Sequence, residues 1–156
     1  MPRLWQVIHS LFGRGVHTPF SFPPRVPVVA LVANEDDRQA LANVSDQELL
    51  EVHFAQSCEE AGAIASRLAA PVILLDRDWP GCDWRTTVQR LAVSPHGACV
   101  ILVSGVTDGY LWQELIRRGG YDILAKPLRA PNIARVIKLA LHYRTSARRF
   151  AVPVRK

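Results

Sequence analysis

Three short, uninterrupted runs of apolar residues restrict the fold of this chain more than any other feature of its sequence. The runs cover residues 28–33, 72–75 and 99–103, and each has the length of a single strand. Apolar residues at every position, rather than at every second one, indicate strands that are covered on both faces. Weaker strand patterns occupy residues 50–55 and 122–125. The sequence therefore predicts five strands, three of which lie deep inside the molecule.

Helical patterns separate and follow these strands. They lie at about residues 36–43, 58–69, 84–92, 109–118 and 131–148. Pro131 opens the last of them, and Gly119 and Gly120 close the fourth, which are positions that these residues favour at helix ends. The alternation predicts an α/β fold, namely a flavodoxin-like, doubly wound, five-stranded parallel sheet with helices on both faces. In such a fold, functional side chains gather at the carboxyl ends of the strands.

Length and composition predict one folded domain over residues 28–144. Apolar residues make up 49% of the chain and charged residues 21%, a balance that excludes a disordered protein. Residues 1–27 are expected to form a basic, proline-rich extension with one short helix around residues 4–12, and residues 145–156 a basic tail. The sequence has no apolar run long enough to span a membrane and no signal-peptide pattern, so we expect a cytoplasmic location.

Charge is distributed unevenly along the chain. Residues 28–127 contain all fourteen acidic residues and eight basic ones, whereas the two flanks carry a charge of +11. An acidic centre with basic ends suits a metal-and-phosphate site better than a surface for nucleic acid. The chain after residue 143 is also too short for a DNA-reading module, so we expect no nucleic-acid partner.

The three cysteines follow no recognisable spacing. Cys58, Cys82 and Cys99 are odd in number and form no C-x-x-C motif. In a cytoplasmic protein this pattern predicts reduced, half-buried thiols rather than a disulfide framework or a metal site.

Three strand ends carry side chains that suit phosphoryl transfer to a carboxylate. Asp76 ends the third predicted strand, Ser104 the fourth, and Lys126 follows the fifth. The carboxylate of Asp76 can attack as a nucleophile to give an acyl phosphate. Ser104 can donate a hydrogen bond to a phosphoryl oxygen, and Lys126 can balance the added negative charge.

With these motifs the sequence resembles the response-regulator receiver family of two-component signalling. The resemblance covers about residues 28–143, and three motifs carry it: Leu-Leu-Asp76-x-x-x-Pro80-Gly81-x-Asp83, Val103-Ser104-Gly105, and the segment from Gly119 to Lys126-Pro127. It implies that a histidine kinase or phosphotransfer protein phosphorylates Asp76 while Mg²⁺ is bound, with the backbone carbonyl of Asp78 among the metal ligands. It also implies that the fourth helix, fifth strand and fifth helix form the face that changes partners. The resemblance further implies that the protein is not an enzyme in the ordinary sense.

The chain departs from the family pattern where the first strand ends. Family members usually carry two adjacent acids there as Mg²⁺ ligands. A gapless alignment with the family pattern, anchored at Arg38, places Val32 and Ala33 at the positions of the two acids. This register abolishes the usual metal site. A shift of a residue or two instead places Asn34 and Glu35 there, and we prefer this register because it leaves the apolar run intact. The expected metal ligands are then Glu35, Asp76 and the Asp78 carbonyl, with Asn34 as an uncharged addition, so Mg²⁺ binding should be weak.

Two further departures concern aromatic residues. Many relatives have a tyrosine or phenylalanine three residues before the lysine, where this chain has Ile123. Tyr121 is expected on the same strand face as Ile123, one step earlier. Trp84 follows Asp83, where a glycine is usual, and Asp83 is expected to cap the helix that begins at Trp84.

The sequence favours a stand-alone receiver that is phosphorylated on Asp76 and acts through protein contacts, with a homodimer as one such contact. The alternative is a degenerate pseudo-receiver that serves as a phosphate-independent interaction adaptor. An unrelated hydrolase or nucleotide-binding domain is disfavoured because the chain lacks a glycine-rich phosphate loop, a G-x-S-x-G motif and a Cys/His pair. Trp112 is the expected anchor of the partner face. The first two hypotheses differ in whether a carboxylate from residues 34–37 joins the three strand-end groups.

Overall fold

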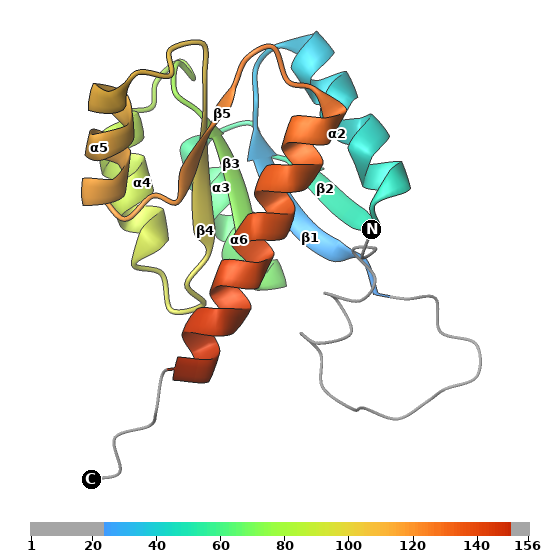
Figure 1. Cartoon of the computed structure of the whole chain (residues 1–156). Helices are drawn as coiled ribbons and strands as arrows, with labels where there is room; N and C mark the ends of the chain where they lie inside the picture. The colour runs from blue at the N-terminus through green and yellow to red at the C-terminus, as the bar shows by residue number, and fades with distance from the viewer. Residues whose placement is uncertain (1–23, 151–156) are drawn as a thin grey trace, which may run out of the picture.

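The computed structural model describes residues 24–150, with side chains up to residue 147. Five strands and five helices alternate along this part of the chain (Figure 1). The strands are β1 (Val26–Leu31), β2 (Leu50–Phe54), β3 (Val72–Asp76), β4 (Cys99–Ser104) and β5 (Asp122–Ala125). The helices are α2 (Glu35–Gln47), α3 (Cys58–Leu68), α4 (Trp84–Ala92), α5 (Gly109–Arg117) and α6 (Ala130–Phe150).

The strands form one parallel sheet in the order β2-β1-β3-β4-β5. This is the flavodoxin-like order, in which the chain first winds to one side of β1 and then to the other. The predicted fold is therefore confirmed. The two strands at the point where the winding direction changes are β1 and β3, and the crevice beyond their carboxyl ends is where such folds place their ligands.

The two faces of the sheet pack against different helices. Val28 and Ala30 of β1 belong to a core cluster with residues of α2 and α6, whereas Val29 and Leu31 belong to a second cluster with residues of α3, α4 and α5. Successive strand residues point to opposite faces, so a strand that is apolar at every position fills both clusters. All the residues of β3 and β4 are buried, as their uninterrupted apolar runs predict.

Several element boundaries differ from those expected. Strand β1 begins at Val26 and includes Pro27, which pairs with Glu51. Both residues were expected in the proline-rich extension that precedes the domain. A proline near a strand's start removes a single donor and keeps an extended backbone, so pairing survives. Helix α2 continues to Gln47 because Val44 adds a buried position to its apolar face, and α6 continues to Phe150. The helix expected around residues 4–12 lies outside the described residues.

Polar side chains begin four of the helices. Asn34, Ser57, Asp83 and Asp108 each accept a hydrogen bond from a backbone N–H in the first turn of α2, α3, α4 and α5, respectively. Such caps satisfy donors that have no partner within the helix. The predicted capping role of Asp83 is confirmed, and the hydrogen bond from the Thr86 hydroxyl lowers the pKa of its carboxyl group.

Two of the cysteines are not reduced thiols as expected. Cys58 and Cys82 form a disulfide across a Cα–Cα distance of 6.4 Å, within the usual range for such bonds, and Cys99 is free and buried. The prediction was wrong because it relied on sequence spacing, whereas the fold brings residues 24 positions apart together. Cys58 begins α3 after β2 and Cys82 lies in the loop after β3, so both occupy the carboxyl edge of the sheet. No helix among the described residues could cross a membrane.

Candidate functional site

The three predicted strand-end residues meet at the carboxyl edge of the sheet. Asp76 is the last residue of β3, Ser104 is the last of β4, and Lys126 follows β5 directly. The strand register places Asp76 beside Val103 and Ser104 beside Ala125, so the three strands end at nearly the same level. The fold therefore brings the carboxylate, the hydroxyl and the ammonium group to one edge, as the sequence predicted.

The carboxylate of Asp76 is buried and surrounded by hydrogen-bond donors. Only 1% of the residue is exposed, and Nζ of Lys126 lies 2.8 Å from each of its two oxygens. The backbone N–H of Asp78 donates to Oδ1 at 3.1 Å, and that of Ala33 to Oδ2 at 3.4 Å. A buried carboxylate needs such partners to offset its loss of hydration. The same donors are positioned to stabilise negative charge that is added at Asp76.

Ser104 is fully buried beside this pair. Its hydroxyl oxygen accepts a hydrogen bond from the backbone N–H of Val106 at 3.0 Å, and its carbonyl oxygen accepts one from the N–H of Lys126 at 3.0 Å. A serine hydroxyl has one hydrogen to donate in addition to its acceptor sites. Ser104 can therefore donate to an anionic group bound at Asp76 without losing the contact that orients it.

The turn that carries Lys126 is held at both ends. The N–H of Lys126 bonds to β4 through Ser104, the Lys126–Pro127 bond is cis, and the N–H of Leu128 donates to Oδ1 of Asp37 at 2.8 Å. Asp37 belongs to α2 and is only 3% exposed. Asp37 was expected only as one possible carboxylate from residues 34–37, and its contact to Leu128 was not predicted. The available signal was its position four and seven residues before Leu41 and Val44, because this helical spacing places all three on the buried face of α2.

The structure corrects the preferred register at the end of β1. Val32 and Ala33, rather than Asn34 and Glu35, follow the strand beside Asp76, and the contact to Asp76 comes from the backbone of Ala33. The amide oxygen of Asn34 is used to cap α2. The side chain of Glu35 is 85% exposed and lies 3.8 Å from Nε of Arg38. Keeping the apolar run intact was the reason for the shifted register, but the strand ends before that run does, at Leu31.

These residues do not fit a resident Mg²⁺ ion. Magnesium in proteins is held by oxygen ligands, which include one or two carboxylates. Asp76 supplies the one carboxylate here, and both of its oxygens already contact Lys126. The side chain of Asp78 points to solvent, and Asp37 is committed to Leu128. Within residues 24–150, no group of three or more acidic, histidine or cysteine side chains could hold a metal.

The aromatic residue near β5 is not placed as expected. Tyr121 packs with the cluster under α2 and α6, whereas Ile123 packs with the cluster on the opposite face. Tyr121 precedes β5, so the two-residue alternation of the strand does not extend to it. Its ring lies 5.3 Å from the ring of Tyr143 on α6, and burial raises the pKa of its hydroxyl group.

The predicted partner face is apolar where α5 and α6 reach solvent. Trp112 is 48% exposed, Ile116 40%, and Leu139 and Tyr143 on α6 49% and 57%. The apolar residues that recur at helical spacing along α6 are all buried: Ile133, Val136, Ile137, Ala140 and Leu141. On its other face Arg135 and His142 are exposed, and Lys138 is half-buried beside Glu48, 3.3 Å away. Large apolar side chains that remain exposed over neighbouring elements mark interaction surfaces.

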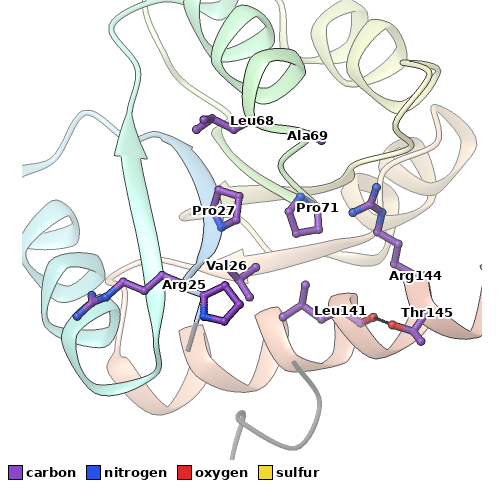
Figure 2. A pocket seen from close by; sticks show the side chains of 10 residues that line it. Arg25, Val26, Pro27, Leu68, Ala69, Pro71, Leu141, Arg144 and Thr145 are labelled. Carbon is purple, nitrogen blue, oxygen red and sulfur yellow. Dashed lines mark hydrogen bonds between the residues drawn. The ribbon is translucent and has the colours of Figure 1, made fainter. Parts of the chain in front are cut away.

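A cavity of about 360 Å³ lies at the other edge of the sheet, away from Asp76 (Figure 2). It is enclosed by the residues that lead into β1, by the end of α3 and by α6, and its walls include Pro27, Pro71 and Leu141. The amino ends of parallel strands seldom carry the chemistry of such folds. We therefore assign the functional site to the opposite edge, around Asp76.

Comparison with known proteins gives one family and many similar structures. A family model described as response regulator receiver domain matches residues 29–138. The chain is similar to the chemotaxis protein CheY4 of Vibrio cholerae, with a TM-score of 0.68 and 19% identity over 74% of this chain and 98% of that one. For a response regulator from Thermotoga maritima the TM-score is 0.68 and the identity 18%, over 76% and 98% of the two chains. No curated protein matches the chain.

A third similar structure is much longer than this chain. NtrX from Brucella abortus aligns with a TM-score of 0.71 and 23% identity, over 80% of this chain but only 28% of its own. Identities this low support the shared fold alone. The residue-level contacts described above therefore have to carry any argument about chemistry.

Proposed function

Because the chain belongs to the response regulator receiver domain family, we propose that it accepts a phosphoryl group on Asp76 and signals through protein contacts. Receiver domains are generally phosphoacceptors rather than catalysts, and they interact with histidine kinases or phosphotransfer proteins. The observation that carries the proposal is the buried Asp76 carboxylate with Lys126 at 2.8 Å from both oxygens. The buried hydroxyl of Ser104 on the neighbouring strand supports the proposal, because it can donate a hydrogen bond to a phosphoryl oxygen.

The chemistry follows from the groups at this edge. A carboxylate oxygen of Asp76 attacks the phosphorus of a phosphohistidine, the P–N bond breaks, and its electron pair returns to the imidazole of the donor. The aspartyl phosphate adds close to two negative charges to the pocket. Lys126 would then turn from the Asp76 carboxylate to the phosphoryl oxygens, and the hydroxyl of Ser104 would donate its hydrogen to one of them while still accepting from Val106. The lost Asp76–Lys126 contact is the local change that the rest of the domain can sense.

The output surface of this proposal is the exposed apolar area on α5 and α6. Lys126 connects β5 to α6, so a shift of its side chain acts next to this surface. We propose that the area binds an output protein or a second copy of the chain, and that the domain works in the cytoplasm as a stand-alone receiver without contacting nucleic acid. The excess of acidic over basic residues between residues 28 and 127 supports the last point, because nucleic acid repels such a surface.

A second function is favoured by the same pocket. Asp76 is already paired with Lys126, and the described part of the chain has no group of three acidic, histidine or cysteine side chains that could hold a metal, so the domain can hold one conformation without phosphate. A degenerate receiver of this kind would act as a fixed interaction adaptor. Its surface would bind the same partner whether or not Asp76 carries a phosphoryl group.

Intact-mass measurement with a small phosphodonor distinguishes the two functions. A receiver that is phosphorylated gains one phosphoryl group, and Asp76→Asn abolishes the gain. Asp78→Asn serves as the matched control, because the Asp78 side chain is exposed and only its backbone contacts Asp76. An absence of label from a small donor and from a phosphorylated histidine phosphotransfer domain, with and without Mg²⁺, would overturn the phosphoacceptor function and favour the adaptor.

A further inference from the structure

We propose that Cys58 and Cys82 form a reversible redox site, which controls how readily the segment after Asp76 opens. The disulfide joins the first residue of α3 to the loop at residues 77–83, which connects Asp76 to α4. The existence of the redox site is independent of the proposed phosphorylation, whereas its effect on Asp76 rests on that function.

The two ends of the loop at residues 77–83 are held, because the N–H of Arg77 bonds to the carbonyl of Val103 and Asp83 caps α4. Between these ends Trp79 packs partly against the second core cluster, and the other loop residues have few attachments besides the disulfide. Within the loop, the N–H of Trp79 bonds to the carbonyl of Asp76 and that of Cys82 to the carbonyl of Trp79, both at 3.3 Å. Asp78, Pro80 and Gly81 are exposed. Segments with few buried contacts and exposed backbone open locally at low cost. The disulfide therefore makes a large contribution to holding this loop against α3.

Opening of the loop bears directly on Asp76. The N–H of Asp78 in this loop donates to the Asp76 carboxylate, which is only 1% exposed. A phosphodonor can reach the carboxylate only when the surrounding chain moves. A loop that is tethered to α3 moves less often, so the oxidised protein should accept a phosphoryl group more slowly than the reduced one.

The two sulfur atoms are accessible to a different degree. Cys58 is 9% exposed and receives a hydrogen bond from the hydroxyl of Thr87 to its sulfur, whereas Cys82 is half-buried at the loop surface. Exchange reactions need access to the sulfur that is attacked. Exchange with a small thiol or disulfide should therefore begin at Cys82, with Cys58 as the resolving thiol.

The redox step is a thiol–disulfide exchange with a low-molecular-weight disulfide. The thiolate of Cys82 attacks one sulfur of the small disulfide and releases a thiolate, which takes up the proton that Cys82 lost. Cys58 then attacks the Cys82 sulfur of the mixed disulfide and releases a second small thiol. Two protein thiols are oxidised and one disulfide is reduced to two thiols. In a compartment that keeps thiols reduced, such a bond is transient and regulatory.

The site itself is tested by counting thiols in the full chain. The protein is equilibrated in glutathione buffers of increasing oxidised fraction, denatured, alkylated with N-ethylmaleimide and weighed. Reduced protein should take up three alkyl groups and oxidised protein only one, on Cys99, with full return to three after reduction. Cys82→Ser should take up two in every buffer. Cys99→Ser is the matched control and should change from two to none, because the two cysteines that remain are the ones that the disulfide joins.

Three results would overturn the reversible site. They are a bond that persists in every glutathione buffer, a bond that never forms, and a stable glutathione adduct in place of the internal disulfide.

Hydrogen exchange then tests the control of the loop without any phosphodonor. Amide protons of residues 77–83 should exchange severalfold faster in the reduced chain and in Cys82→Ser, and equal rates would overturn the link between the disulfide and loop opening.

The effect on Asp76 is measured last, as the rate of labelling by acetyl phosphate. Reduced protein and Cys82→Ser should be labelled severalfold faster than oxidised protein, and Cys99→Ser should keep the redox response. Equal rates would overturn the coupling to Asp76. If no form of the protein is labelled, the phosphoacceptor function fails, and the thiol count and hydrogen exchange still decide the redox site.

Discussion

At the residue scale, the three predicted strand-end side chains lie together, but the two residues that follow β1 beside them carry no acid. Asp76, Ser104 and Lys126 meet at one edge, whereas Ala33, two residues after β1, contacts Asp76 through its backbone N–H. A methyl side chain contributes no charge to a metal site. A single substitution at residue 33 can therefore test whether an added carboxylate creates a metal site.

Ala33→Asp should create a Mg²⁺ site that Asn34→Asp does not. The backbone N–H of residue 33 contacts Asp76, so we expect a carboxylate introduced there to come within reach of an ion at Asp76. One added charge near a divalent ion contributes on the order of 1–3 kcal/mol, or about tenfold to a hundredfold in affinity. Asn34 is turned towards α2, where an aspartate would simply keep the cap. Titration calorimetry with Mg²⁺ would check this. Equal binding by the two variants would show that the register seen at the end of β1 does not decide metal affinity.

Asp37 illustrates a residue whose importance lies in a single buried contact. Its carboxylate accepts the N–H of Leu128 across 91 positions of sequence and fixes the turn that carries Lys126. Asp37→Ala leaves that N–H without its partner, so the free energy of unfolding should fall by about 1–3 kcal/mol. Asp37→Asn retains an acceptor oxygen and should lose less. Urea denaturation measures both, and an Ala variant as stable as the parent would contradict the role assigned to this contact.

At the element scale, α5 and α6 divide their residues between core and surface. The apolar positions of α6 recur at helical spacing and are buried, while Trp112 on α5 remains half exposed. That division could be predicted from the sequence, because helical periodicity separates buried from outward positions without knowledge of the rest of the fold.

Trp112→Ala should weaken binding of a protein partner without destabilising the domain. A large exposed aromatic side chain on an interaction surface often contributes about 2 kcal/mol or more to binding, which corresponds to roughly a thirtyfold loss of affinity. Val93→Ala is the control, since Val93 is 77% exposed just after α4 and is not a residue of α5 or α6. Affinity of the purified partner or of the homodimer is the measurement. An unchanged dissociation constant with Trp112→Ala would remove this face from the proposal.

The loops between elements were harder to predict than the elements. Strand β3 follows from its apolar run, but the disulfide between Cys58 and Cys82 depends on two loops meeting at one edge of the sheet. The register at Ala33 depends on where β1 stops pairing, and a difference of one or two residues reverses the conclusion about metal ligands. Both are consequences of tertiary structure, which neither periodicity nor spacing encodes.

At the scale of the whole molecule, stability should reside in residues 25–150. The two core clusters draw their buried residues from this range, and Arg25 adds contacts from its guanidinium group to the carbonyl groups of Leu50 and Ser45. A chain of residues 25–150 should therefore melt within a few degrees of the full chain, as measured by circular dichroism. A large drop would mean that residues 1–24 or 151–156 contribute to the stability of the domain, and would overturn this prediction.

Because α6 is long, a movement of the helix next to the pocket displaces residues that lie far from the pocket. The helix has 21 residues, which correspond to about 31 Å, and it is anchored next to the site through Leu128 and Asp37. A rigid rod of this length acts as a lever. A tilt of only about 5° at the anchored end would displace the far end by roughly 3 Å, given the rise per residue of a helix. A tilt that starts near Lys126 would therefore displace the end of α6 at Phe150 more than the residues next to the pocket.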